Sequence, residues 1–301
     1  MSEQRNQYPT EPGELRAQYL IEPGELLARL GEPGLTVIDA RWDLDDRDGG
    51  RQAYHAGHIP GARYVSWLDD FSDANDPVEG QLAAPADFAH AMSAAGVGDT
   101  SEVVAYDDNT IFMAARLLWA LNVYGHDRVR VLDGGWPAWL RSGGPAEMVV
   151  PPSGAGRFTP APVRDLRLTK EQMLAAVESG VMQIADCRMD RTWHMSGAHI
   201  PGAVRLPAPS LVQPGSGTVQ DAAGVHRLLA EAGLDAGRPI ALYCGGGVSA
   251  AEAFMALRMA GIQTARVYDG SWTEWGADPA TPKAPHSSNA GIGRGGPAKI
   301  V

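Results

Sequence analysis

The two halves of this 301-residue chain carry the same three sequence blocks in the same order. The blocks are VIDARW with AGHIPGA (within 37–62) and QIADCRMDRTWHMSGAHIPGA (183–203); VVAYDDNTIFMAARLLWAL (103–121) and PIALYCGGGVSAAEAFMAL (239–257); VRVLDGGWPAWL (129–140) and ARVYDGSWTEWG (265–276). Three ordered matches do not arise by chance. The chain is therefore expected to fold into two domains of the same architecture, which its length can accommodate.

Each copy alternates short apolar runs with helical stretches, which predicts an α/β fold with a mainly parallel sheet flanked by helices. We expect an N-terminal domain over 19–148, a linker rich in proline, glycine and alanine over 149–166, and a C-terminal domain over 167–284. Residues 1–18 and 285–301 lack apolar periodicity, so they are expected to be disordered tails.

The composition narrows the class of protein. A net charge of −11 disfavours nucleic acid and anionic membranes as partners, although it does not exclude small anionic ligands. No apolar run is long enough to span a bilayer, and the polar start lacks the core of a signal peptide. The chain has only two cysteines, which rules out a disulfide framework and favours a reducing compartment. We expect a cytoplasmic protein.

Cys244 lies between an expected strand (239–243) and an expected alanine-rich helix, and three glycines follow it. The start of a helix carries partial positive charge, and glycine lets backbone N–H groups converge on one point. Such an environment lowers the pKa of a thiol and makes it a nucleophile. The alternative is an inert cysteine of the core. The three glycines favour the reactive thiol, because glycine costs stability where the backbone does not need it.

GHIPGA, VLDGGWPAW and the loop Tyr-Cys-Gly-x-Gly-Val-Ser together resemble the two-domain rhodanese family of sulfurtransferases, over about residues 19–283. In that family the C-terminal domain carries the active cysteine and the N-terminal domain is a degenerate copy. The resemblance implies that Cys244 is the catalytic residue. Its counterpart is Asp107, which cannot accept a sulfur atom, so the first copy is expected to be silent and to wall the cleft.

The family's reaction runs through a cysteine persulfide. The resemblance implies a small anionic sulfur donor, such as 3-mercaptopyruvate or thiosulfate, and an acceptor such as cyanide or a thiol. No metal or cofactor is implied. Backbone N–H groups of the loop are expected to hold the terminal sulfur; the loop residues are Gly245, Gly246, Gly247, Val248 and Ser249.

The loop also bears on the donor. Thiosulfate-type members of the family carry two cations in it, whereas mercaptopyruvate-type members carry none, as here, which favours 3-mercaptopyruvate. Gly246 replaces the serine of a proton relay proposed for the second type. His58 matches the relay histidine, with Asp46 or Asp48 as its acid. The alternative for His58 is a turn histidine bonded to nearby backbone.

The long arginine-bearing insert that family members use to clamp the donor anion is missing here. Arg191 is the best remaining candidate for this contact. Arg188 is a weaker one, because Arg41 repeats it in the silent copy, which suggests a structural role. Cys187 is either a redox-active partner of Cys244 or, as we favour, a small buried side chain matching Ala40.

Three other functions compete. A phosphatase with a Cys-x5-Arg loop is disfavoured because Ala250 stands where the arginine is needed. A thiosulfate:cyanide sulfurtransferase and a low-activity sulfur carrier or scaffold remain open. The repeated residues Asp133 and Asp269, each followed by glycine, are expected to be turn residues.

Overall fold

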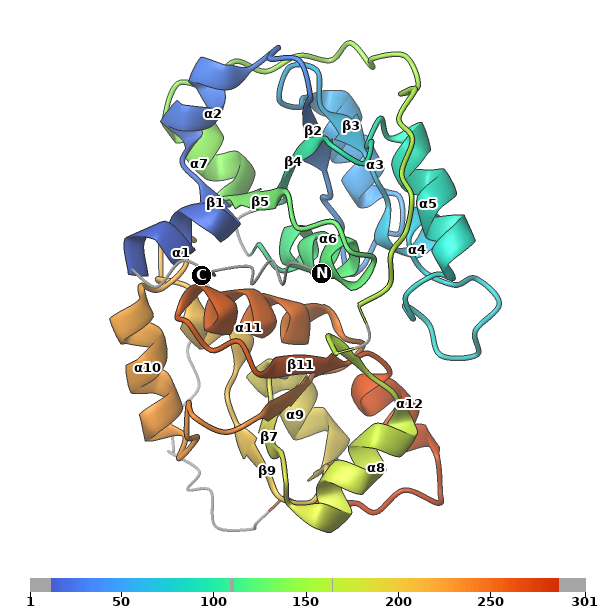
Figure 1. The fold of residues 1–301 in the computed structure, drawn as a ribbon, viewed down its shortest axis with the longest axis vertical. Helices are drawn as coiled ribbons and strands as arrows, with labels where there is room; N and C mark the ends of the chain where they lie inside the picture. Colours follow the sequence, from blue (N-terminus) through green and yellow to red (C-terminus); the bar gives the residue numbers. More distant parts are fainter. Residues whose placement is uncertain (1–11, 109–110, 164, 287–301) are drawn as a thin grey trace, which may run out of the picture.

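The computed structural model describes residues 12–108, 111–163 and 165–286, and it folds the two repeats into two α/β units stacked on each other (Figure 1). Each unit has a five-stranded sheet in which all the pairings are parallel. The strand orders are β1-β5-β4-β2-β3 and β6-β11-β10-β7-β9, so the second sheet repeats the topology of the first. The predicted α/β fold with two tandem domains is confirmed.

The N-terminal unit contains α1 (Pro12–Tyr19), β1 (Leu20–Ile21), α2 (Pro23–Arg29), β2 (Leu35–Asp39), α3 (Gly49–Ala56), β3 (Arg63–Tyr64), α4 (Trp67–Asp70), α5 (Pro85–Ala94), β4 (Glu102–Tyr106), α6 (Phe112–Val123), β5 (Val129–Leu132) and α7 (Gly135–Arg141). The C-terminal unit contains β6 (Arg167–Leu168), α8 (Lys170–Ser179), β7 (Gln183–Asp186), α9 (Asp190–Ser196), β8 (Ala198–His199), β9 (Ala203–Arg205), the 3-10 helix η1 (Ala208–Leu211), α10 (Ala222–Glu231), β10 (Ile240–Tyr243), α11 (Val248–Met259), β11 (Ala265–Tyr268), α12 (Ser271–Ala277) and β12 (Ala284–Pro285). Strand β12 pairs with β8 in an antiparallel ribbon.

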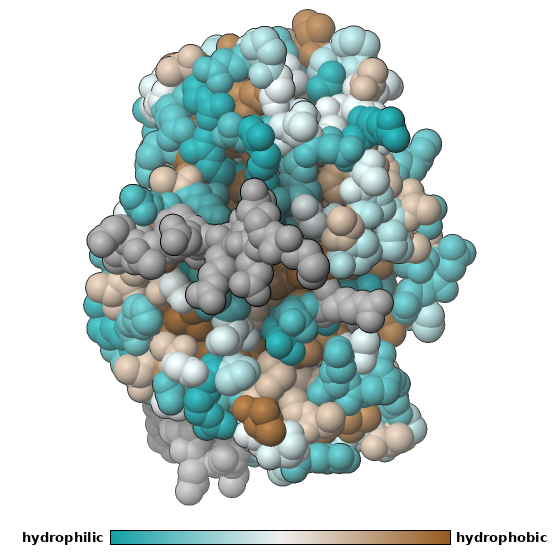
Figure 2. Space-filling model, viewed as in Figure 1, coloured by the Kyte–Doolittle hydropathy of each residue, from teal (hydrophilic) through white to brown (hydrophobic). Residues whose placement is uncertain are grey.

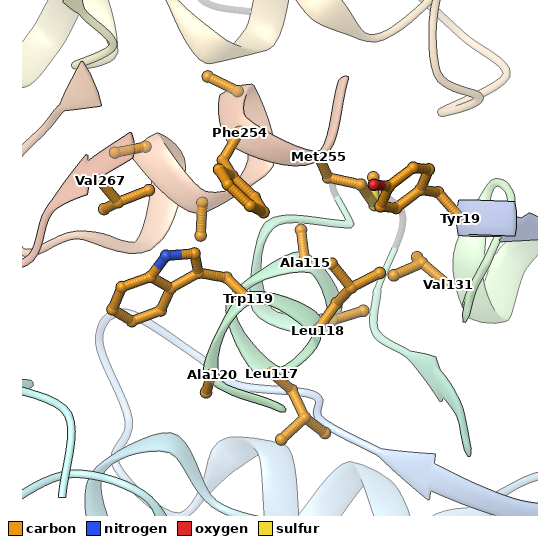
Figure 3. Packing of buried hydrophobic residues seen from close by; sticks show 14 of the residues in the cluster. Tyr19, Ala115, Leu117, Leu118, Trp119, Ala120, Val131, Phe254, Met255 and Val267 are labelled. Carbon is orange, nitrogen blue, oxygen red and sulfur yellow. The ribbon is translucent and has the colours of Figure 1, made fainter. Parts of the chain in front are cut away.

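Helices α6 and α11 lie between the two sheets and pack against each other (Figure 1). Both are apolar on nearly every side, which is the pattern of a helix buried all round. Trp119 of α6 and Phe254 of α11 belong to one continuous core that spans both units (Figure 3). The first residues of both helices are thereby held at the junction between the units.

Two matched aspartates tie each unit to a loop of the other. Asp269 accepts a hydrogen bond from the backbone N–H of Leu82 at 3.0 Å, and Asp133 accepts one from the N–H of Val219, also at 3.0 Å. Asp133 is also paired with Arg16. The interpretation of these aspartates as turn residues was therefore incomplete, because their carboxylates are buried and bind across the junction. Sequence spacing does not reveal such long-range contacts.

The expected linker has no helix or strand over residues 149–163 and 165–166. It is nevertheless attached to the N-terminal unit. The N–H of Gly154 donates to the carbonyl of Ala94 at 2.9 Å, and the carbonyl of Arg157 accepts from the N–H of Asp99 at the same distance. Phe158 is buried against Phe88. The linker therefore follows the surface of the first unit as a bound strap.

The expectation of a disordered tail over residues 1–18 is wrong for its last part, because helix α1 begins at Pro12. Leu15 and Tyr19 lie four residues apart on one face of the helix and are both buried. Leu15 also lies close to Gly261, at the end of α11. Residues 1–11 and 287–301 lie outside the described residues, so the remainder of both expected tails is not described.

Hydrophilic side chains are spread over both units on the face seen in Figure 2, with apolar residues interspersed. Within the part of the chain that the structure describes, no helix is both long and apolar enough to cross a membrane.

The contacts of Asp133 predict that Asp133→Ala lowers the free energy of unfolding by about 1–3 kcal/mol, because the N–H of Val219 loses its acceptor and Arg16 its counter-charge. Urea unfolding measures the change. Asp127→Ala, at an exposed position, is the control and should stay within about 0.5 kcal/mol of the parent. Equal effects of the two substitutions would contradict the junction role.

Candidate active site

Cys244 directly follows β10, the central strand of the second sheet, and the loop 245–247 leads from it into α11. Its backbone N–H donates to the Ser271 hydroxyl at 3.1 Å, and its carbonyl accepts from the N–H of Trp272 at 3.0 Å. The carbonyl of Gly245 is bonded in turn by Thr273. The start of α12 thus fixes the backbone of the loop, and Cys244 as a whole residue is only 2% exposed.

Backbone N–H groups surround the thiol as expected, but burial has the larger effect on its acidity. Burial raises the pKa of the Cys244 thiol, while the N–H groups of Ala250, Gly247 and Ser249 and the charge of Arg116 act in the opposite direction. The prediction of a lowered pKa is therefore wrong for the free thiol. The predicted set of amides is also corrected, since Ala250 belongs to it.

Only one of the three loop glycines is required by the backbone. Gly247 has a φ of 81°, and a Cβ atom there would lie 2.8 Å from Nη1 of Arg116 and 2.8 Å from the carbonyl oxygen of Asp269. A Cβ at Gly245 would meet no atom within 4 Å, and one at Gly246 would just reach Trp67 at 4.0 Å. The space in front of the loop is therefore free of loop side chains.

The matched loop of the N-terminal unit contains the same arrangement with a carboxylate in it. One oxygen of Asp107 accepts from the N–H of Ile111 at 2.9 Å, and the other accepts from those of Met113 at 2.8 Å and Ala114 at 3.0 Å. These three N–H groups hold the N-cap, second and third positions of α6, as the three around Cys244 do in α11. Burial raises the pKa of Asp107 to about 7.

An apolar cluster from both units covers the first residue of α11. Val248 packs with Met113 of the N-terminal unit, and Trp42 and Trp67 border them. The two indole rings meet edge to face with their centroids 5.3 Å apart. These N-terminal residues form a wall beside the cysteine loop, which is the role expected for the silent copy.

Arg188, the weaker candidate for binding the donor, is committed to the fold. It is buried, its Nη2 bonds the Asp186 carboxylate at 2.5 Å, and its Nη1 bonds the Ser196 hydroxyl at 2.7 Å. Its guanidinium lies over the ring of Trp272. Arg41 makes the matching pair with Asp39 in the first unit. Arg188 is therefore corrected from a substrate ligand to a structural residue.

His58 has no free ring nitrogen for a proton relay. Nδ1 lies 2.8 Å from the carbonyl oxygen of Tyr54, and Nε2 lies 3.3 Å from that of Val149. The ring is fully buried and stacked on Tyr54. The expected acids do not contact it: Asp46 bonds the N–H of Asp48 and both are exposed. The relay hypothesis is thus corrected, and His58 is the turn histidine of the alternative interpretation.

Arg191 is exposed in the first turn of α9, and this helix follows β7 at the same sheet edge as Cys244. Cys187 follows β7 as well and is completely buried, and both cysteines are free. Burial, and then the negative charge that Cys244 would carry, raise the pKa of Cys187 well above its ordinary value. Complete burial fits the small core residue that we favour, and the two nearby thiols are not joined in a disulfide.

Sequence reasoning missed two charged residues near these loops, Arg116 of α6 and Glu252 of α11. Both are buried at matching positions of the two central helices. The sequence did carry a signal for both residues, since each is the single charged residue in the largely apolar first half of its helix. Among the described residues, no group of three or more histidine, cysteine, aspartate or glutamate side chains could hold a metal ion.

Comparison with known proteins gives the class of the fold. The rhodanese-like domain matches the chain twice, at residues 22–142 and 169–278. The crystal structure of SseA from Escherichia coli, a 3-mercaptopyruvate sulfotransferase, superposes with a TM-score of 0.79 at 28% identity, covering 84% of this chain and 98% of that one. The chain belongs to the rhodanese family and carries its domain in tandem.

The relatives also give the type of enzyme. SseB of Mycobacterium tuberculosis H37Rv, which carries the name of a thiosulfate sulfurtransferase, is 34% identical over 85% of this chain and 92% of its own length. The 3-mercaptopyruvate sulfurtransferase of E. coli K12 is 30% identical over 85% and 94%. The thiosulfate sulfurtransferase of Gallus gallus is 30% identical over 80% and 86%. The protein is a sulfurtransferase of this group.

The loop geometry predicts unequal effects of two alanine substitutions. Gly247→Ala forces a side chain into the left-handed region and against Arg116, so it should cost about 1–3 kcal/mol of stability and disorder the N–H groups around Cys244. Gly245→Ala, its matched control, meets open space and should leave stability within about 0.5 kcal/mol of the parent. Urea unfolding and the rate of Cys244 alkylation test both, and equal effects of the two would refute the argument.

Proposed function

We propose that this sulfurtransferase moves a sulfane sulfur from a small anionic donor through a persulfide on Cys244 to a thiophilic acceptor, cyanide or a thiol. The observation that carries the proposal is a pair of matched sets of three backbone N–H groups, each of which we call a cradle. One surrounds Cys244 and the other surrounds Asp107; they are formed by Gly247, Ser249 and Ala250 and by Ile111, Met113 and Ala114. The carboxylate oxygens of Asp107 lie two bonds beyond Cβ, as the terminal sulfur of a cysteine persulfide does. The occupied cradle therefore displays the anion geometry that the Cys244 cradle would accept.

In the first half of the reaction, the thiolate of Cys244 attacks the outer sulfur of the donor. The bond between this sulfur and the rest of the donor breaks, and its electron pair leaves with the remainder. That remainder is sulfite from thiosulfate, or the enolate of pyruvate from 3-mercaptopyruvate, which then takes up a proton. In the second half, the acceptor attacks the terminal sulfur and the Cys244 thiolate departs.

The three N–H groups act mainly on the intermediate. Burial disfavours the free thiolate, whereas a persulfide extends its charged sulfur one bond further into the cradle. Donors aimed at the position where charge develops stabilise that state more than the starting state. The cradle thus supports sulfur transfer without any metal in the step.

The uncharged loop supports 3-mercaptopyruvate as the preferred donor. Gly245 and Gly246 provide no cation for the thiosulfate dianion. There would be room for a Cβ atom at either position, so neighbouring residues do not require glycine there. Relatives of both donor types match at similar identity, so the preference rests on the loop. Thiosulfate:cyanide sulfurtransferase is the alternative. We also propose a reducing, cytoplasmic setting, which two free cysteines support.

Transfer chemistry predicts that incubation with 3-mercaptopyruvate adds the mass of one sulfur atom to the protein, and that peptide mass spectrometry places it on Cys244. Cys244→Ser should gain nothing, and Cys187→Ala should behave as the parent. Steady-state kinetics with both donors should give a higher kcat/KM for 3-mercaptopyruvate. A higher value for thiosulfate would reverse the donor assignment, and a persulfide without turnover would indicate a sulfur carrier.

Arg191 is proposed as the group that binds the donor carboxylate, because it is the exposed cation on α9 beside the sheet edge of Cys244. Arg191→Ala should raise the KM for 3-mercaptopyruvate about tenfold with a smaller change in kcat, as expected for loss of one charge-assisted contact. Arg227→Ala, an exposed arginine on α10, is the control. An unchanged KM in Arg191→Ala would remove this residue from the site.

A further inference from the structure

The two central helices each bury one ionisable residue at their fifth position, a basic one in α6 and an acidic one in α11. Arg116 of α6 is 0% exposed and Glu252 of α11 is 3% exposed. Taking a charged side chain out of water costs several kcal/mol unless partners compensate. Two such residues at equivalent places in the junction therefore require an explanation.

Arg116 reaches across the junction to the cysteine loop. Its Nη2 donates to Oδ1 of Asp269 at 2.5 Å and to the carbonyl of Gly80 at 2.9 Å, and its Nη1 donates to the carbonyl of Gly247 at 3.4 Å. Gly247 is the N-cap residue of α11, whose own N–H faces Cys244. The guanidinium of Arg116 is thus bonded to the residue whose N–H is one of the three that form the cradle.

Glu252 occupies the mirror position and faces the other loop. Within the described residues its Oε1 has no hydrogen-bond partner. Burial, and then the charge of Asp107, raise the pKa of Glu252 well above its ordinary value. The loop that carries the cysteine is therefore contacted by an arginine of the other unit, whereas the loop that carries Asp107 is faced by a glutamate.

We propose that Arg116 of the silent unit is a positioning residue for the Cys244 reaction, which fixes Gly247 and places positive charge behind the cradle that receives the persulfide. The inference rests on the proposed function of Cys244. Asp269 does not cancel this charge, because it is shared with Arg167 at 2.8 Å, so the three groups sum to one positive charge. The other titratable groups beside the loop are Cys187 and Glu252, and burial raises the pKa of each.

A purely structural role for Arg116 makes the opposite prediction for the acidity of Cys244. If the residue only clamps the two units, its loss loosens the loop, admits water and lets the raised pKa of Cys244 fall toward its ordinary value. If its charge stabilises the thiolate, removing that charge raises the pKa further. The direction of the shift therefore separates the two roles.

The test uses the full chain with Cys187→Ala, so that Cys244 is the single thiol, and follows iodoacetamide alkylation against pH. Arg116→Met should raise the pKa of Cys244 by about one pH unit. It should also lower kcat/KM at pH 7 about tenfold, because a pKa that is one unit higher leaves about ten times less thiolate at that pH. Arg116→Lys, which keeps the charge, should stay near the parent. Glu252→Met is the matched control, because it alters the equivalent position of α11 without removing a positive charge, so it should not raise the pKa of Cys244.

An unchanged or lowered pKa in Arg116→Met, or an equal rise in Glu252→Met, would overturn the proposal. Circular dichroism checks folding. If Arg116→Met does not fold, Arg116→Gln and Arg116→Lys provide the same comparison of neutral and charged side chains. Alkylation requires no sulfur donor, so a parent that forms no persulfide while Arg116→Met still shifts the pKa would refute the proposed function but not the effect of Arg116 on the thiolate.

Discussion

The packing of α6 against α11 is the contact on which the rest of the molecule depends. Both helices are apolar around most of their circumference, so neither unit can bury its own central helix without the other. Their first turns are consequently fixed at the junction, where Met113 of α6 packs with Val248 of α11. The site is therefore a property of the pair of domains, although the cysteine belongs to only one of them.

The same backbone device serves two purposes in the two units. Three N–H groups at the start of a buried helix need an acceptor, since unpaired buried donors cost stability. In the first unit Asp107 supplies this acceptor permanently. In the second unit the N–H groups face the thiol of Cys244. A thiol is a poor hydrogen-bond acceptor, and in the proposed reaction it would gain a second sulfur atom that carries negative charge. The difference between Asp107 and Cys244 thus accompanies the difference between a filled, structural set of N–H groups and one whose occupant could change.

The sequence was sufficient for the fold and for the place of Cys244 in it, because a repeat fixes the number of domains and a strand–glycine–helix pattern places Cys244 between β10 and α11. It was insufficient wherever a contact joins distant residues. The hydrogen bonds of Asp133 and Asp269 to loops of the other unit leave no local pattern. Burial of Cys244 also arises from residues of both units, so a local argument from N–H groups missed the largest influence on its pKa.

The buried ion pair of Arg116 and Asp269 joins the N-terminal unit to the C-terminal unit beside the cysteine loop. An ion pair inside a protein is weak support for stability, because apolar residues of similar volume often serve as well. Its cost is justified where a fixed charge does something that apolar packing cannot do. Here the fixed charge belongs to the copy without a cysteine, and it lies behind the loop of the copy with one. With the roles proposed for Cys244 and Arg116, the residue that would carry the sulfur and part of the electrostatic field that would stabilise its charge belong to different units.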